Sequence, residues 1–280
     1  MGLTGDKLFG AGAVLFDLDG VITPTADLHM QAWAGLFQPL FASAGVADYG
    51  DSDYFTFLDG KPRTAGIGSL LDDRGLDHDD AYVVELGERK NALFLELLAA
   101  GIEPYPGSVR FIDALDEAGI AKAVVSSSKN ASQVLTSAGL RDRFTVVVDG
   151  AVSAAQGLPG KPAPDTYLYG AELLGVPSST ALVIEDAISG VQAGAAGDFA
   201  GVVGVDRGAG AGALSEAGAT VVVRELDELL YVLARLHPLL RKSVRDEFLS
   251  SVRRTQPHDA RRQSPQPPRG PGDRPLDASG

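Results

Sequence analysis

The sequence predicts a doubly wound α/β fold, in which helices cover both faces of a parallel sheet, with an α-helical domain inserted after the first strand. Three observations carry this prediction: short continuous apolar runs, helix-like segments between them, and a long stretch at residues 23–101 with helical patterns alone. Strands buried on both faces read as continuous apolar runs, and their alternation with helices is typical of parallel sheets. With 280 residues and 45% apolar composition, the chain can bury a substantial core.

The first predicted element is residues 13–16, an apolar run that ends in Asp17 and is expected to be a buried strand. Similar runs predict further strands at residues 121–125, 144–148, 181–184, 200–205 and 220–223. Helical patterns separate these runs and predict helices at residues 108–118, 131–138, 164–174, 190–196 and 225–236. On this alternation we assign residues 1–22 and 102–238 to one Rossmann-like α/β core.

The inserted stretch, residues 23–101, is predicted to be a helical cap with long helices at 27–44 and 79–100. Because the first strand precedes the insert and the others follow it, we expect the cap over the carboxyl ends of the strands, where open α/β sheets bind ligands. Residues 239–280 should be a helix end followed by a basic, Pro-rich tail, disordered from about Thr255. This tail is either a dispensable extension or an interaction segment.

Composition excludes several classes of chemistry and partner. The chain has no cysteine, which excludes disulfides, thiolate metal sites and cysteine nucleophiles, so a metal must use oxygen or imidazole ligands. The net charge of −13 argues against a nucleic-acid partner, because an acidic surface repels the phosphate backbone. The apolar stretches are short, so we expect a cytoplasmic protein with no membrane partner. An acidic surface and a two-domain cleft favour a monomer.

Polar side chains cluster beside the predicted strands at four points, which are Asp17 with Asp19, Ser126 to Asn130, Lys161, and Glu185 with Asp186. Because the carboxyl ends of parallel strands face the same side, we expect these clusters to converge. Crowded carboxylates repel one another unless a cation lies between them. Hard oxygen ligands select Mg²⁺, so the sequence predicts a magnesium site.

Asp17 is the natural nucleophile, because a carboxylate can form an aspartyl-phosphate and split one difficult displacement into two easier ones. Asp19, held by the turn at Gly20, is placed to protonate the leaving oxygen and to activate the attacking hydroxyl, which contributes roughly 10²- to 10⁴-fold. Each cluster alone has a plainer interpretation, since Asp-Leu-Asp-Gly and Gly-Lys-Pro form turns and serines cap helices. The order of all four clusters beside strands favours an active site.

These clusters resemble the four motifs of the haloacid dehalogenase superfamily over residues 13 to about 205, through Asp17-Leu18-Asp19-Gly20-Val21, Ser126, Lys161 and Glu185-Asp186. The resemblance implies Asp17 as nucleophile and Asp19 as acid and base. It also implies that Ser126 and Lys161 hold the transferring phosphoryl group. It implies a Mg²⁺ site formed by Asp17, Glu185, Asp186 and the Asp19 carbonyl. The dehalogenase branch lacks the second aspartate, so phosphoryl transfer is preferred over carbon–halogen cleavage.

A finer resemblance is to the β-phosphoglucomutase family, through Thr23-Pro24-Thr25-Ala26, His29, Trp33, Gly60, Arg63, Lys90-Asn91 and Ser126-Ser127-Ser128-Lys129-Asn130. It implies that Arg63, Ser128 and Asn130, with Ser127 beside them, bind the second, non-reacting phosphate of a sugar phosphate. An arginine fork suits that role. His29 and Lys90 would couple cap closure to Asp19, with Thr25 at the hinge. Asp59 departs from the family, which has lysine there.

Taken singly, His29 could be a packed histidine, and Arg63 and Lys90 solvated surface charges. The leading hypothesis is a mutase that converts β-glucose 1-phosphate to glucose 6-phosphate. The alternative is a sugar-phosphate phosphatase, in which water replaces the sugar hydroxyl as acceptor. A catalytically silent binding module is a third class, disfavoured because Asp17, Asp19 and the other motif residues are intact.

Overall fold

The computed structural model describes residues 12–58 and 63–230. Six strands in these ranges form one sheet in the order β3-β2-β1-β4-β5-β6, and every neighbouring pair is parallel. The strands are β1 (Ala13–Phe16), β2 (Ala121–Val125), β3 (Val146–Val148), β4 (Ala181–Glu185), β5 (Gly201–Val205) and β6 (Val221–Val223). The chain builds outward from β1 in one direction and from β4 in the other, which confirms the doubly wound prediction.

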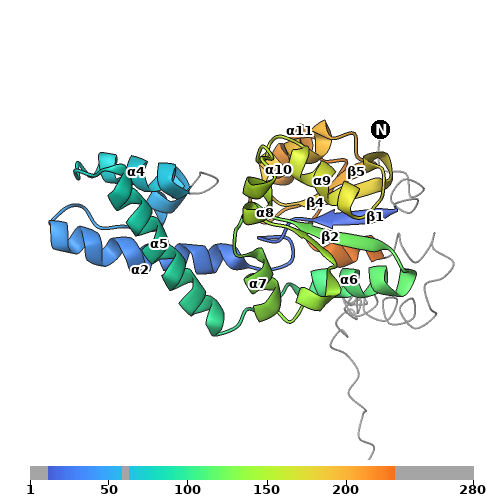
Figure 1. The fold of residues 1–280 in the computed structure, drawn as a ribbon, viewed down its shortest axis with the longest axis horizontal. Coiled ribbons are helices and arrows are strands. Elements are labelled where there is room, and N and C mark those ends of the chain that lie inside the picture. Colours follow the sequence, from blue (N-terminus) through green and yellow to red (C-terminus); the bar gives the residue numbers. More distant parts are fainter. Residues whose placement is uncertain (1–11, 59–62, 231–280) are drawn as a thin grey trace, which may run out of the picture.

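Helices cover both faces of the sheet (Figure 1). One face carries α9 (Asp165–Leu173), α10 (Ile188–Ala196) and α11 (Ala211–Glu216), and the other carries α6 (Pro106–Ala118) and α7 (Ala131–Ser137). Short elements connect these layers, namely η2 (Arg141–Arg143), α8 (Gly150–Ala155), η3 (Ser178–Thr180) and η4 (Leu226–Leu229).

Alternation along the strands explains the two layers, because successive side chains of a strand point to opposite faces. Phe16 of β1 packs edge-on against Phe111 of α6 in one apolar cluster. Its neighbour Leu15 belongs to the other cluster, together with Tyr167 of α9. The central strands β1 and β4 are therefore buried on both sides, as their continuous apolar sequences predict, whereas the edge strands β3 and β6 are partly exposed.

The described part of residues 23–101 contains helices and no strand, as predicted. These helices project away from the sheet (Figure 1) and are α2 (Thr25–Ala44), α3 (Asp51–Asp53), the π-helical turn η1 (Tyr54–Leu58), α4 (Arg63–Asp73) and α5 (Asp80–Ala99). They share an apolar core of their own that includes Trp33, Phe37 and Leu86. The domain limits given above stay a prediction.

The two chain segments that connect these helices to the sheet lie side by side. The backbone N–H of Tyr105, which precedes α6, donates to the carbonyl of Ile22 at 2.9 Å. The Ser108 hydroxyl donates to the carbonyl of Val21 at 2.6 Å. The segments that lead into α2 and out of α5 are therefore fastened together at the edge of the sheet.

Some predicted boundaries were wrong. Strand β3 begins two residues later than the predicted 144–148, because the N–H of Phe144 donates to Arg141 and its carbonyl accepts from the Arg141 guanidinium. Helices α4, α8 and α11 were not predicted. The segment predicted as a helix at 225–236 begins with the 3₁₀ turn η4. Residues from 231 onward, including the predicted tail, lie outside the described residues, as does Asp59.

Among the helices of the described ranges, none is both long and apolar enough to cross a membrane.

Candidate active site

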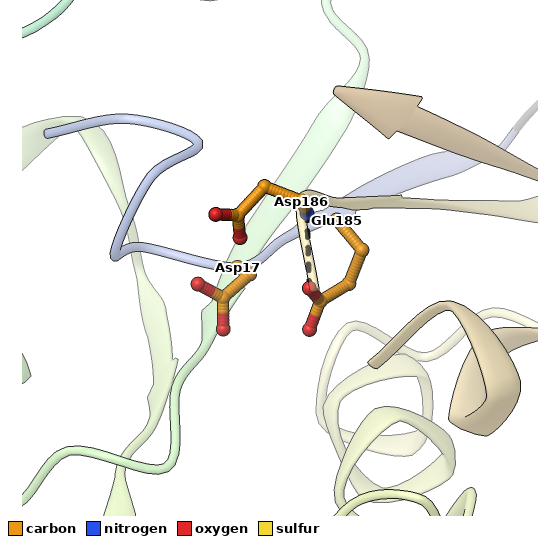
Figure 2. A group of neighbouring side chains, drawn as sticks. All are labelled: Asp17, Glu185 and Asp186. Atoms are coloured by element: carbon orange, nitrogen blue, oxygen red, sulfur yellow. Dashed lines mark hydrogen bonds between the residues drawn. The ribbon is translucent and has the colours of Figure 1, made fainter. Parts of the chain in front are cut away.

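Three carboxylates meet where β1 and β4 end (Figure 2). Asp17 follows β1, Glu185 is the last residue of β4, and Asp186 follows it. The two strands are direct neighbours, and the N–H of Asp17 donates to the carbonyl of Ile184 at 2.9 Å. Carboxylate oxygens of the three residues lie within 4.8 Å of one another. The sheet order therefore brings together motifs that are far apart in the sequence.

Two glycines make room for these carboxylates. Gly20 has a φ of 81°, and a Cβ there would lie 2.0 Å from Oδ2 of Asp186. A Cβ at Gly190 of α10 would lie 1.7 Å from Oε1 of Glu185. Side chains at these positions would occupy the space of the carboxylates, so the close approach requires glycine.

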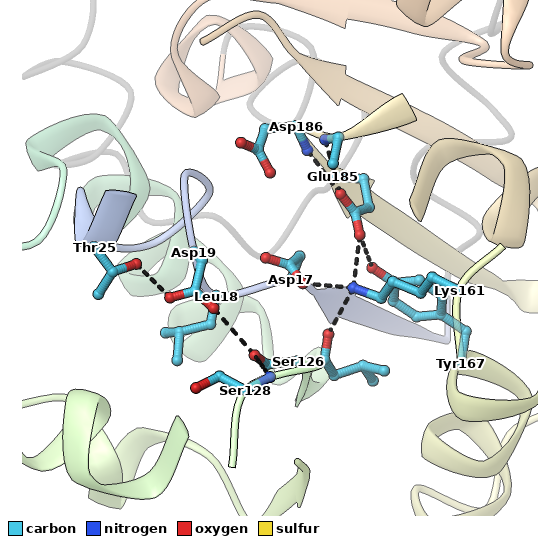
Figure 3. A network of polar contacts seen from close by, with 12 residues as sticks. Asp17, Leu18, Asp19, Thr25, Ser126, Ser128, Lys161, Tyr167, Glu185 and Asp186 are labelled. Carbon is cyan, nitrogen blue, oxygen red and sulfur yellow. Dashed lines mark hydrogen bonds and ion pairs between the residues drawn. The ribbon is translucent and has the colours of Figure 1, made fainter. Parts of the chain in front are cut away.

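Lys161 lies among the carboxylates and bonds to two of them (Figure 3). Its Nζ donates to Oδ1 of Asp17 at 2.5 Å, to Oε1 of Glu185 at 2.6 Å and to the Val125 carbonyl at 3.2 Å. Its side chain is 8% exposed. Burial would lower the pKa of Lys161, but the charges of Asp17 and Glu185 outweigh burial and hold this pKa well above its ordinary value. Lys161 is therefore a buried ammonium.

Glu185 accepts hydrogen bonds at both carboxylate oxygens. Oε1 accepts from Lys161 and, at 3.1 Å, from the hydroxyl of Tyr167. Oε2 accepts from the backbone N–H groups of Asp186 and Ala187, both at 3.0 Å. Glu185 therefore fixes Lys161 and the loop after β4 in one arrangement.

The electrostatics of this cluster favour a bound cation. Burial, together with the charges of Glu185 and Asp19, raises the pKa of Asp17 to about 8 against the opposing effect of Lys161. Burial, followed by the charges of Glu185 and Asp17, raises the pKa of Asp186 to about 9. In the absence of a cation, the ionised forms of Asp17 and Asp186 are thus disfavoured, and a bound cation would stabilise them. An all-oxygen donor set of this kind fits a hard divalent cation such as Mg²⁺.

Asp19 turns away from this cluster (Figure 3). Its Oδ1 accepts from the hydroxyl of Thr25, the first residue of α2, and its Oδ2 accepts from the Ser126 hydroxyl at 3.2 Å. Burial raises the pKa of Asp19 despite these two bonds. The carboxylate therefore connects the first helix of the insert to the loop after β2.

His29 and Lys90 form a second polar group between α2 and α5. Nζ of Lys90 lies 2.5 Å from Nδ1 of His29, whose ring stacks on Phe94 at 4.3 Å between ring centres. Burial, followed by the charge of Arg63, lowers the pKa of Lys90 to about 7. Burial, followed by the charges of Lys90 and Arg63, lowers the pKa of His29 to about 3. At neutral pH His29 is therefore an uncharged acceptor for Lys90.

Arg63 and Asn130 form a third polar group, and they meet through Asn91. Nη2 of Arg63 donates to Oδ1 of Asn91 at 3.1 Å, and Nη1 donates to the Gly87 carbonyl at 3.3 Å. Nδ2 of Asn130 donates to the same Asn91 oxygen at 2.8 Å. The N–H of Asn130 also donates to the hydroxyl of Ser128 at 3.1 Å. Arg63 is therefore a hydrogen-bonded residue rather than a freely solvated surface charge.

The predicted site residues thus form the carboxylate cluster with Lys161, the contacts of Asp19, and the second and third polar groups. Ser127 is exposed beside the third polar group. Sequence reasoning gave no role to Asn91, Tyr167 or Arg207. Nε of Arg207 donates to the Gly20 carbonyl at 2.9 Å, and its guanidinium lies 3.8 Å from the centre of the Tyr105 ring. The sequence feature that could have indicated Arg207 is its position two residues after the apolar run at 200–205, at the end of a predicted strand like the other site residues.

A buried aspartate–lysine pair beside clustered carboxylates, at the carboxyl edge of a doubly wound sheet, fits the class of α/β enzymes that transfer phosphoryl groups. Residues 11–198 match the haloacid dehalogenase-like hydrolase family, and the chain belongs to this family. The chain is 44% identical over 239 residues to a β-phosphoglucomutase of Mycobacterium tuberculosis, which covers 78% of this chain and 91% of that protein. The chain is thus an enzyme, a phosphotransferase or phosphatase.

Solved structures agree with this assignment. A β-phosphoglucomutase from Clostridium difficile matches with a TM-score of 0.65 and 25% identity, over 86% of this chain and 99% of that one. CbbY from Rhodobacter sphaeroides, in complex with xylulose 1,5-bisphosphate, matches with a TM-score of 0.64 and 25% identity, over 78% of this chain and 96% of that one.

Proposed function

We propose that this enzyme is a β-phosphoglucomutase, which converts β-glucose 1-phosphate to glucose 6-phosphate through an aspartyl-phosphate on Asp17. The observation that carries the proposal is the pair of separate polar groups, Asp17 with Lys161 and Arg63 with Asn130. A mutase must hold a phosphate at each end of one sugar, and these groups suit the reacting and the second phosphate. The 44% identical relative bears the same name.

In the proposed reaction, a carboxylate oxygen of Asp17 attacks the phosphorus of a sugar bisphosphate, and the bond to the sugar oxygen breaks. Asp19 gives its proton to that leaving oxygen. The phosphorylated Asp17 then transfers this group to the 6-hydroxyl of β-glucose 1-phosphate, and Asp19 takes the proton of that hydroxyl. The bisphosphate so formed turns, and Asp17 regains a phosphoryl group from its other end, which releases glucose 6-phosphate. Lys161 and Ser126 hold the transferring group. Lys161, which already bonds Asp17, counters the raised pKa of the nucleophile and favours its ionised form.

Asp17, Glu185, Asp186 and the Asp19 carbonyl would hold Mg²⁺. When bound, this ion would neutralise negative charge on the phosphoryl oxygens and the carboxylates. The donors fit the ion because they are oxygens that lie close together, and because a cation would stabilise the ionised forms of Asp17 and Asp186.

Asp19 must change partners to act as an acid. In this structure Thr25 and Ser126 hold its carboxylate. Because Thr25 begins α2, movement of the insert toward the sheet would pull Thr25 away and release Asp19. His29 on α2 and Lys90 on α5 bind each other, so the two helices would move together. This coupling would allow proton transfer only when the sugar is enclosed.

The alternative is a sugar-phosphate phosphatase, in which water attacks the aspartyl-phosphate. The same residues serve both reactions, and the bisphosphate bound to CbbY supports a bisphosphate ligand in either case. The reactions differ in whether the closed site excludes water.

Phosphorus NMR of the purified protein with Mg²⁺ and β-glucose 1-phosphate tests the proposal, with and without a trace of glucose 1,6-bisphosphate. Formation of glucose 6-phosphate that the bisphosphate accelerates is the expected result, whereas accumulation of inorganic phosphate would favour the phosphatase.

Arg63→Ala should abolish the mutase reaction, and Arg89→Ala, at an exposed position of α5, serves as the control. Unchanged turnover in Arg63→Ala would refute the assignment. A monomeric and cytoplasmic protein remains part of the proposal.

A further inference from the structure

We propose that Asn91 is an internal competitor of the substrate's second phosphate: its side-chain oxygen occupies the place of a phosphate oxygen between Arg63 and Asn130. This inference rests on the proposed function and adds a residue that sets the affinity for bisphosphates. Asn91 would be a positioning residue that gives up its contacts when the ligand binds.

The geometry that supports this inference is the convergence of two donors on one oxygen. Arg63 begins α4 in the insert, whereas Asn130 precedes α7 beside the sheet. Their side chains reach Oδ1 of Asn91 at 3.1 and 2.8 Å. An oxygen that accepts from a guanidinium and an amide has the same partners as one oxygen of a bound phosphate. Asn91 therefore marks an oxyanion position that spans the insert and the core.

The bonds to Asn91 matter for stability because the two donors are partly or fully buried. Asn130 is 5% exposed, so its amide would lose hydrogen bonding if Asn91 offered no acceptor. Arg63 lies against α5, where a Cβ at Gly87 would approach its Cδ to 3.3 Å. Burial lowers the pKa of Arg63, which reflects the partial loss of water around the guanidinium. Asn91 thus stabilises both donors in the free protein, and a phosphate must replace these bonds to bind.

Two substitutions of Asn91 change the competition in opposite directions. Asn91→Leu keeps the approximate shape but removes the acceptor, so the donors are unpaired before binding and the affinity for glucose 1,6-bisphosphate should rise about tenfold. Asn91→Asp keeps the acceptor and adds a charge that binds Arg63 and repels phosphate, so the affinity should fall by about tenfold or more. Ala92→Asp adds the same charge at the next, exposed position and should change the affinity by less than about twofold.

Calorimetric titration with glucose 1,6-bisphosphate and Mg²⁺ measures these affinities in full-length protein, with Asp17→Asn present throughout to prevent turnover. A second measurement, with Asp17 intact, is the hydrolysis of acetyl phosphate, which has no second phosphate. Its kcat/KM should stay within about twofold of the wild-type value in Ala92→Asp, and each Asn91 variant should change it less than it changes the bisphosphate affinity. A purely structural defect would lower this second value as well.

The inference is supported if Asn91→Leu binds the bisphosphate more tightly than the wild type and Asn91→Asp binds it more weakly. Weaker binding in both variants would overturn it, because Asn91 would then be an ordinary ligand or a structural residue. Failure of the wild-type protein to form glucose 6-phosphate, with the order of affinities retained, would refute the mutase and leave the competition standing. Absence of bisphosphate binding in every protein would overturn both proposals.

Discussion

At the scale of single residues, the main feature of the candidate site is that one cation, Lys161, contacts a cluster of three carboxylates. Lys161 bonds to Asp17 and Glu185, while Asp186 has its pKa raised to about 9 by burial and by neighbouring carboxylates. A cation bound at Asp186 would remove that electrostatic cost. The proposed metal site would thus relieve the repulsion among these carboxylates.

Removal of the Asp186 carboxylate should weaken metal binding. We expect EDTA to abolish turnover and Mg²⁺ to restore it, and Asp186→Asn to require at least about tenfold more Mg²⁺ for half-maximal activity. Titration of activity with Mg²⁺ measures this change. Glu172→Gln, which removes the same charge at an exposed position of α9, should leave the requirement unchanged. Equal Mg²⁺ requirements in the two variants would contradict a role of Asp186 in metal binding.

The lowered pKa of Lys90 predicts that the stability of the protein depends on pH above about pH 7. Its pKa is lowered from 10.5 to about 7 in the folded protein by burial, so between these values the unfolded chain binds a proton that the folded one does not. The free energy of unfolding should therefore rise with pH through this window, by about 3 kcal/mol between pH 6.5 and 9.5 relative to Lys90→Met. Urea denaturation of both proteins at each pH measures the difference.

Identical pH profiles for wild type and Lys90→Met would show that Lys90 titrates normally. His29 does not disturb this comparison, because its pKa is lowered to about 3 in the folded protein. His29 lowers the free energy of unfolding only as the pH falls below about 6.5, where the unfolded chain binds a proton that the folded one does not.

At the scale of elements, α10 lies so close to the end of β4 that a side chain at Gly190 would overlap Glu185. Gly190→Ala should lower the free energy of unfolding by about 2 kcal/mol through overpacking, and should also lower activity because Glu185 positions Lys161. Gly212→Ala in α11, where a Cβ meets open space, should be neutral or stabilise by up to about 1 kcal/mol. Urea denaturation of the two variants checks this contrast, which equal effects would contradict.

The sequence predicted the elements that rest on strong local patterns and missed those that depend on tertiary contacts. The strands at the centre of the sheet are continuous apolar runs, and both long helices of the insert have clear periodicity. Helix α4 contains Gly66 and Gly68, which oppose a helical prediction. Gly66 is required by packing, because a Cβ there would lie 2.9 Å from the Phe57 carbonyl. Propensity alone therefore pointed away from α4.

In the candidate site too, the features set by local sequence were predictable and those set by tertiary contacts were not. Asp17, Lys161 and Glu185 were predictable as neighbours, because strand order places their loops at one edge. The contact of Asp19 with Thr25, and the position of Asn91 between two donors, depend on how the insert sits on the core. Periodicity and spacing within a sequence contain no direct information about that arrangement.

At the scale of the whole molecule, Arg207 joins four segments of the chain. It bonds to the carbonyls of Gly20 and Arg224 and to the carboxylate of Glu225, and it lies over the ring of Tyr105. It therefore ties the loop that contains Gly20 to the segment that leaves the insert.

Arg207→Met should lower the free energy of unfolding by about 2 kcal/mol more than a matched surface change, because it leaves the carbonyl of the buried Gly20 without its donor and removes the packing on Tyr105. The matched change is Arg110→Met, which removes an exposed ion pair with Asp227 and leaves the contacts of Gly20 unchanged. Chemical denaturation of both variants gives the comparison. Equal losses would mean that Arg207 is an ordinary surface residue.

The side-by-side connections at Ile22 and Tyr105 have an evolutionary consequence. A segment whose two ends meet adds little strain to the chain that carries it, and such points tolerate insertions and exchanges. Helices α2 to α5 can therefore lengthen, shrink or be replaced by another module while the register between β1 and its neighbours is kept. Changes of length in the insert therefore need not disturb the packing of the sheet that carries Asp17 and Glu185.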